Sequence, residues 1–405
     1  MTSAVSGHIM TMSRHIALLF LARGLRGFGD GFAVIILPAY LSALGYDPIA
    51  VGIVATASLL GTALLTLAVG VVAPHFDLRT LLLWGAGILA ATGIAFPAAH
   101  HLLLIAVIAF VGTINPSSGD LGMLVPLEHA MLARGTEDQE RTKVFARYSL
   151  IGALTMAGGS LAASLPDWLV ADGYDRLGAL RLMFLLYAAL GILGVLLYRH
   201  LPHARAEERH HAPLGPSRRT VYKLATLFSI DAFAGGFIAQ SLLVLWLFDQ
   251  FGLSLSGAAL FFFWSNTLSA FSHPVAAWIA TRCGLVNTMV FTHIPSSIFL
   301  ILAPLAPNLY VALGLLLLRS ALSQMDVPTR TSYVMAVVTP PERPAAASIT
   351  AAPRSVAASI SPALAGVLLT SAFPGAPLVI CGVLKIAYDI ALLRSFRHIK
   401  PPEEA

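Results

Sequence analysis

Long apolar runs recur along the whole chain, and they constrain its fold more than any other feature. The 405 residues are 57% hydrophobic and only 11% charged, with a mean hydropathy of +0.80, whereas soluble domains carry about 25% charged residues. A helix needs roughly 20 apolar residues to cross a bilayer core. The runs have this length, so the sequence predicts an all-α membrane protein with twelve transmembrane helices.

Breaks rich in glycine, proline and charge separate the runs and set the predicted boundaries. The expected spans are 15–43, 49–73, 79–98, 102–133, 141–165, 178–199, 221–249, 253–281, 286–304, 307–336, 343–371 and 374–395. Two of them, 102–133 and 307–336, are longer than a bilayer requires, so we expect them to tilt or to extend beyond it.

Basic residues are distributed unevenly between alternate loops. One set of loops and the two tails contain nearly all of them, whereas the other set contains only Arg176 and Arg181. The positive-inside rule therefore predicts a multi-pass protein of the cell inner (plasma) membrane with both termini cytoplasmic. Although the sequence pI is about 9.4, the basic residues form no patch, so we expect no nucleic-acid partner.

The chain also repeats itself at a nearly constant offset. An offset of 207 residues places Arg147 on Arg354, and an offset of 206 places Asp120 on Asp326. Matches of this kind predict two pseudo-symmetric six-helix bundles in parallel arrangement, as in transporters that rock one half against the other.

The longest polar stretch divides the two repeats. Residues 200–220 are expected to form a cytoplasmic linker between an N-terminal bundle, 1–199, and a C-terminal bundle, 221–405. Its four histidines could bind metal, but a solvated basic linker is the interpretation we adopt.

The loop between the second and third spans resembles a known motif. Residues 70–79 read GVVAPHFDLR, and a second copy at 277–284 reads AWIATRCG. Both are similar to the G-x-x-A-D-R-x-G-R loop of the major facilitator superfamily, with Pro74 and Thr281 in place of its acidic residue. The resemblance extends over essentially the whole chain. It implies the major facilitator fold and secondary transport by alternating access, without a cofactor.

The first span carries three charged residues, Arg23, Arg26 and Asp30. Their spacing places them on one helical face, and charges in the hydrocarbon region need a partner or a water-lined cavity. Asp30 could be a cavity carboxylate that takes up a proton or a cationic substrate. It could instead pair with Arg26, or pair elsewhere for packing.

Two hairpins each place an acid and a base at similar distances from their turn. Asp120 and Arg147 flank the turn near residue 135, and Asp326 and Arg354 flank the turn near residue 340. We expect each to form a pair, which is either a static brace or a contact that changes partners during transport.

Other polar residues in the spans complete the predicted pathway. These are Arg319 and Arg330 on the tenth span, and Asp231 and Gln240 on the seventh. Lys385 and Asp389 on the last span are four residues apart and are expected to pair with each other.

These features favour proton-coupled secondary transport of a small solute by a monomer, with the lipid bilayer as its surroundings. A partial antiporter pattern of glycines, Gly152 and Gly158-Gly159, favours export. A transporter of metal ions or cationic metabolites is the alternative. A polytopic enzyme or sensor is a distant one, because no HExxH, GxSxG or P-loop motif is present. We therefore expect no catalytic activity and no resident metal.

Overall fold

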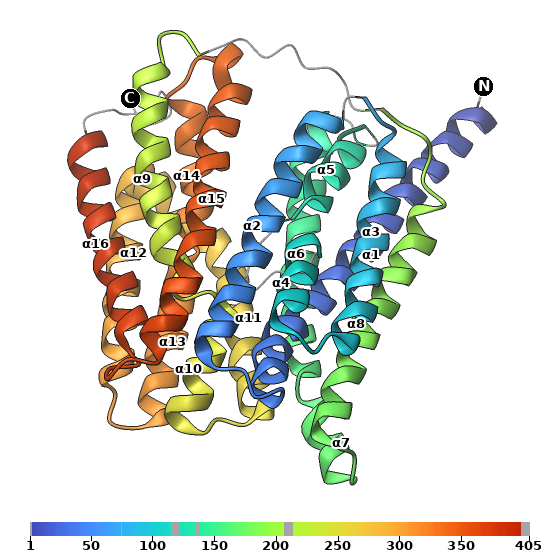
Figure 1. Cartoon of the computed structure of the whole chain (residues 1–405). Helices are drawn as coiled ribbons and strands as arrows, with labels where there is room; N and C mark the ends of the chain where they lie inside the picture. The colour runs from blue at the N-terminus through green and yellow to red at the C-terminus, as the bar shows by residue number, and fades with distance from the viewer. Residues whose placement is uncertain are drawn as a thin grey trace. The chain divides into compact units, whose positions relative to one another are not determined.

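Helices make up nearly all of the regular structure (Figure 1). The computed structural model describes residues 2–73, 75–112, 114, 122–134, 136, 138–205 and 214–397. Within these residues are sixteen α-helices and two short 3-10 helices. Nine stretches of the described residues are long and apolar enough to cross a membrane.

The nine stretches, together with α1, the α4/α5 pair and α11, correspond in chain order to the twelve expected spans. In the first half the helices are α1 (Thr2–Ala43), α2 (Pro48–Val72), α3 (Leu78–Ala98), α4 (Leu102–Val111), α5 (Leu124–Arg134), α6 (Asp138–Ala162), α7 (Leu165–Ala171) and α8 (Arg176–Tyr198). In the second half they are α9 (Arg218–Gly236), α10 (Gln240–Phe251), α11 (Leu255–Cys283), α12 (Leu285–Leu302), η1 (Ala303–Leu305), α13 (Leu309–Ser323), α14 (Asp326–Ala336), η2 (Pro340–Glu342), α15 (Arg343–Leu369) and α16 (Ala376–Phe396).

The helices form two compact units. Unit 1 comprises Met1–Gly45, Gly61–Glu208 and Leu255–Phe263, and unit 2 comprises Tyr46–Leu60, Arg209–Ser254 and Trp264–Ala405. Each unit has its own apolar core, built in unit 1 on α1, α3, α5, α6 and α8 and in unit 2 on α9, α12, α14 and α16. Polar positions in a unit are therefore held by that unit's own helices.

Two spans of unit 2 are interrupted partway along. The seventh consists of α9 and α10, which meet at Phe237–Ala239, and the tenth consists of α13 and α14, which meet at Gln324 and Met325. Interruptions at membrane depth free backbone groups, which are tolerated where protein or water surrounds them.

In each unit the first span packs against the fifth through small residues: α1 packs against α6, and α9 packs against α15. In unit 1 the hydroxyl of Ser160 donates to the carbonyl of Gly31 at 3.3 Å. In unit 2 the hydroxyl of Ser361 donates to the carbonyl of Phe233 at 2.5 Å, and a side chain at Gly236 would collide with Ser361. The two serines are 201 residues apart (361 − 160) and the two glycines 205 (236 − 31).

These contacts correct the predicted register of the repeat. An offset of 201 aligns Arg147 with Ser348 rather than with Arg354, so the offset of 207 is wrong on this helix. Arg147 is exposed, whereas Arg354 is only partly exposed. On the preceding span, α5 and α14 are each 11 residues long and begin 202 residues apart, whereas Asp120, on which the predicted offset of 206 depends, lies outside the described residues.

Two carboxylates bind the two ends of the segment that joins the halves. Asp77 caps α3, accepts hydrogen bonds from the backbone of Ala204 at 2.7 Å and from His203 Nδ1 at 2.9 Å, and also accepts from Thr80. Burial alone would raise the pKa of Asp77, but the hydrogen bonds from Ala204, His203 and Thr80 outweigh it and lower this pKa.

At the other end, Glu342 binds the residues that lead into α9. It accepts hydrogen bonds from the hydroxyls of Ser217 at 2.7 Å and Thr339 at 2.6 Å, and from the backbone of Gly215. These bonds to the ionised form lower the pKa of Glu342 to about 2. The ends of the predicted linker 200–220 are thus attached to the helical units.

Replacing Glu342 by glutamine should lower the unfolding temperature at neutral pH and flatten its dependence on pH in acid. Because the pKa of Glu342 is about 2 when folded, against an ordinary 4.5, its stabilisation is complete above about pH 4.5. It is lost as the pH falls toward 2. Thermal unfolding of the purified protein between pH 7 and pH 3 measures this effect.

The matched control is Asp175→Asn, which weakens a cap on α8 that binds Gly178 and no linker residue. The control should retain the wild-type slope between pH 4.5 and pH 3. An unchanged slope in Glu342→Gln would contradict the role given to this carboxylate.

Candidate functional site

A buried carboxylate is the centre of the polar interior of unit 1. Glu128 of α5 is 0% exposed and binds Arg26 of α1 through Nη2 and Oε2 at 2.6 Å. The hydroxyl of Tyr198 donates to Oε1 at 2.6 Å, and the hydroxyl of Tyr148 donates to Oε2. One cation and two hydroxyls therefore compensate a charge that would be costly alone in this setting.

The alternative that Arg26 pairs with Asp30 is wrong, because Arg26 reaches Glu128 instead. Asp30 accepts a hydrogen bond from the hydroxyl of Tyr187 at 3.4 Å. Asp30 and Arg26 also line a small cavity of unit 1 together with Thr62, whose buried hydroxyl has no hydrogen-bond partner. Asp30 thus faces a cavity within its own unit, next to the Arg26–Glu128 pair.

The glycines of α6 make room for α1. The guanidinium of Arg23 lies over the ring of Tyr148, 5.3 Å from its centre, and a side chain at Gly152 would collide with this guanidinium. A side chain at Gly159 would collide with the carbonyl of Phe28. Two of the three glycines in the pattern that favoured export, Gly152 and Gly159, therefore have a packing explanation in this chain.

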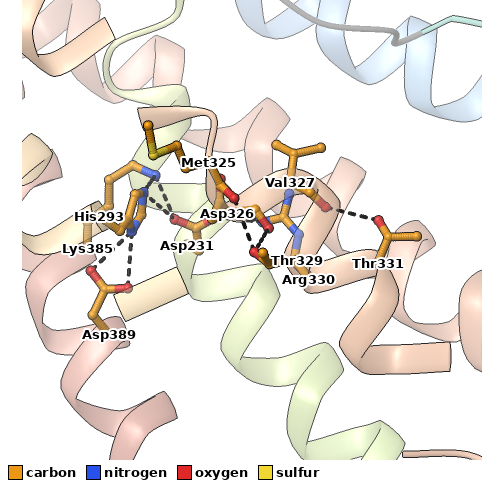
Figure 2. A network of polar contacts seen from close by, with 10 residues as sticks. All are labelled: Asp231, His293, Met325, Asp326, Val327, Thr329, Arg330, Thr331, Lys385 and Asp389. Carbon is orange, nitrogen blue, oxygen red and sulfur yellow. Dashed lines mark hydrogen bonds and ion pairs between the residues drawn. The ribbon is translucent and has the colours of Figure 1, made fainter. Parts of the chain in front are cut away.

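Unit 2 has a larger ionic network (Figure 2). Asp231 of α9 is its centre: Lys385 donates to Oδ1 at 2.6 Å and Arg330 Nη1 donates to Oδ2 at 3.3 Å. The same Arg330 nitrogen donates to Asp326 at 2.9 Å. Helices α9, α14 and α16 are thereby joined through one carboxylate that is 4% exposed.

A second carboxylate extends the network toward α12. His293 Nδ1 lies 3.1 Å from each oxygen of Asp389, and its Nε2 lies 3.3 Å from Lys385 Nζ. Nε2 is also 3.9 Å from Asp231. The predicted Lys385–Asp389 pair is therefore wrong, since each of the two residues has a closer partner on another helix.

The corresponding spans of the two units carry opposite charges. Arg330 is 202 residues after Glu128, the offset that relates α14 to α5. In unit 1 a base on α1 pairs with an acid on α5. In unit 2 an acid on α9 pairs with a base on α14.

Of the two predicted hairpin pairs, the structure describes both members of only one. Asp326 binds Arg330 on its own helix, so the prediction that it pairs with Arg354 is wrong. Asp120, the predicted partner of Arg147, lies outside the described residues.

Two further predicted residues lie in unit 2. Gln240 donates to Asn266 on α11 at 3.1 Å. Arg319 on α13 lies in a membrane-spanning segment, near Cys381.

The sequence analysis missed Glu128 and the participation of His293 in a network. Glu128 was the more visible of the two, because a carboxylate within an apolar span always requires compensation. The network of His293 could not be predicted in this way, because the sequence around a single histidine does not indicate which other helices will contact it.

The fold and the paired charges within apolar helices in both units define a multi-pass helical membrane protein. The family model of the Major Facilitator Superfamily matches residues 19–247 and 224–405. The chain belongs to this superfamily.

Known proteins with similar sequence or fold agree with this assignment. An uncharacterized membrane protein of Saccharomyces cerevisiae, YJR124C, is 25% identical over 95% of this chain and 94% of its own. A bacterial homologue of the human lysosomal transporter Spinster superposes with a TM-score of 0.74 at 14% identity, over 96% of this chain and 98% of its own. The xylose transporter XylE from E. coli gives 0.71 at 14% identity, over 94% and 96%. These structures share the fold.

Replacing Glu128 by glutamine should destabilise the protein by about 3–5 kcal/mol, because Arg26 would remain buried without its counter-charge. Changing both residues, as Arg26→Gln with Glu128→Gln, should cost less than the sum of the two single changes. Denaturant unfolding of the wild type, the two single variants and the double variant measures the interaction free energy between Arg26 and Glu128. The exposed Arg147→Gln serves as the control and should change stability by about 0.5 kcal/mol or less. Additive single effects would refute the pairing.

Proposed function

We propose that this chain is a secondary active transporter that carries a small solute by alternating access and couples its movement to protons. Membership in a transporter superfamily supports the first part. The geometry around His293 is the observation that supports the second, because it places one titratable ring between a lysine and two carboxylates.

The contacts of His293 select one form of its ring. An ammonium group only donates, so Nε2 must accept from Lys385. Nδ1 then carries the proton and donates to Asp389. The ring is neutral in this arrangement, and each of its nitrogens has a partner.

A proton bound at Nε2 would change these contacts. The imidazolium could not accept from Lys385, and the two cations would repel each other. The ring would instead be attracted to Asp231, whose Oδ1 lies 3.9 Å away, in competition with Lys385. Protonation would thus weaken the link between α16 and α9, which is how a proton could alter the packing of the unit.

Unit 1 supplies a second candidate for the proton, since Asp30 lines a cavity beside Arg26. We further propose a monomer in the inner (plasma) membrane with both termini cytoplasmic, on the distribution of basic residues between loops.

The glycines of α6 serve packing, so the proposal covers transport in either direction. In the described part of the chain, no three His, Cys, Asp or Glu side chains come together to hold a metal ion.

Changing His293 to glutamine should abolish proton movement that accompanies the solute, because the amide cannot be protonated near neutral pH. Solute binding should remain. The assay is a pH-sensitive dye enclosed in liposomes with the reconstituted protein, with binding followed separately as a rise in unfolding temperature.

His273→Gln, on α11 outside the network, is the matched control and should keep coupled proton movement. Full coupling in His293→Gln would assign the proton to another group, and loss of coupling in Asp30→Asn would then point to unit 1.

A further inference from the structure

Positive charge exceeds negative charge in the interior of unit 2. The buried and partly buried charged side chains of its α-helices are the acids Asp231, Asp326 and Asp389 and the bases Arg319, Arg330, Arg354 and Lys385. Three acids face four bases, because the contacts of His293 keep that ring neutral. One positive charge in this part of the described chain has no counterpart.

Arg354 is the first base that the carboxylates leave without a contact. It lies within the apolar span Ala345–Leu369, and its Nε is buried with no hydrogen-bond partner. Among the described residues, Asp231 and Asp326 form their ion pairs with Arg330 and Lys385, and neither reaches Arg354. The like charge of Arg330 acts on Arg354, as do the opposite charges of Asp231 and Asp326, which form no ion pair with it.

Arg319 is the second such base. It lies on α13 within the span Leu309–Ala336, and the titratable group that acts on it is the thiol of Cys381, which is 0% exposed. No ion pair of Arg319 occurs in the part of the chain that the structure describes. Its backbone carbonyl accepts from Ser296, and the hydroxyl of the adjacent Ser297 is buried without a partner.

Two guanidinium groups without an ion pair are costly inside membrane-spanning helices, because charge is poorly solvated there. The two other buried or partly buried bases of unit 2, Arg330 and Lys385, each have a carboxylate within 3.3 Å. A cost that the protein does not offset by itself can be offset when a ligand of opposite charge binds. Guanidinium groups bind carboxylates and phosphates through paired hydrogen bonds.

We propose that the transported solute is an organic anion whose carboxylate or phosphate binds the guanidinium of Arg354 beside Arg330, with Arg319 adding positive charge to the same unit. The inference rests on the proposed transport function and names its substrate class. Arg330 is already held by Asp231 and Asp326, so it is a fixed donor, whereas the buried Nε of Arg354 has no hydrogen-bond partner in the protein.

The first test needs no knowledge of the solute. Without ligand, Arg354→Gln should raise the unfolding temperature of the purified full-length protein, because it removes an uncompensated charge. Arg330→Gln should lower it, because it breaks two ion pairs. Arg147→Gln, an exposed arginine of unit 1, should leave it unchanged. A fall in unfolding temperature with Arg354→Gln would show that Arg354 has a structural partner and would overturn the inference.

The second test compares matched solutes. Succinate is paired with neutral succinamide, and glycerol 3-phosphate with glycerol, so that the two arms separate carboxylate from phosphate recognition. At least one anion should raise the unfolding temperature while its neutral counterpart does not. Arg354→Gln should weaken that binding at least tenfold, and Arg354→Lys should weaken it less, because the charge is retained.

Binding of the neutral members alone, or anion binding that Arg354→Gln leaves unchanged, would overturn the inference. So would the absence of any shift with both anions. Because these measurements use no gradient, they are separate from the test of proton coupling. An anion bound through Arg354 without accompanying proton movement would refute the coupling and leave the substrate class in place.

Discussion

A charge between apolar helices is stable only when an opposite charge or several hydrogen-bond donors lie directly against it, and both units of this protein are organised around that requirement. In unit 1 the carboxylate of Glu128 connects α5 to α1, α6 and α8 through Arg26, Tyr148 and Tyr198. In unit 2 the carboxylate of Asp231 connects α9 to α14 and α16. Each carboxylate therefore fixes helices that apolar packing alone would allow to slide.

The reversal of charge between the two units shows what the repeat conserves. In each unit the first and fourth spans are joined by an ion pair, yet the acid and the base are exchanged between them. A pair of opposite charges satisfies the same physical requirement in either order, because attraction does not depend on which helix carries the acid. The units differ in what surrounds the pair: tyrosine hydroxyls in unit 1, and further charges with a histidine in unit 2.

That difference gives the two units separate tasks in the proposed cycle. The pair in unit 1 is enclosed by neutral donors, which favours a constant brace. The network in unit 2 contains a ring that can gain a proton and bases that lack acids, so its contacts depend on what is bound. A transporter needs such a dependence, because a ligand shifts a conformational equilibrium only when it interacts differently with the two states.

The sequence by itself determined the class of fold and the family, because apolar runs of bilayer length and a repeated loop motif are properties of the chain alone. It also singled out Asp231, Arg330 and Arg26, each of which forms an ion pair. Tertiary structure decided which charges meet. Asp326 was expected to pair with Arg354, but its partner is Arg330. Lys385 was expected to pair with Asp389, but its partner is Asp231. Matching depth on two helices does not fix how each helix is rotated. A shift of a few residues in register, such as the one that separates Arg147 from Arg354, turns a side chain to a different neighbour. Rotation and register follow from close packing of small residues such as Gly31 against Ser160.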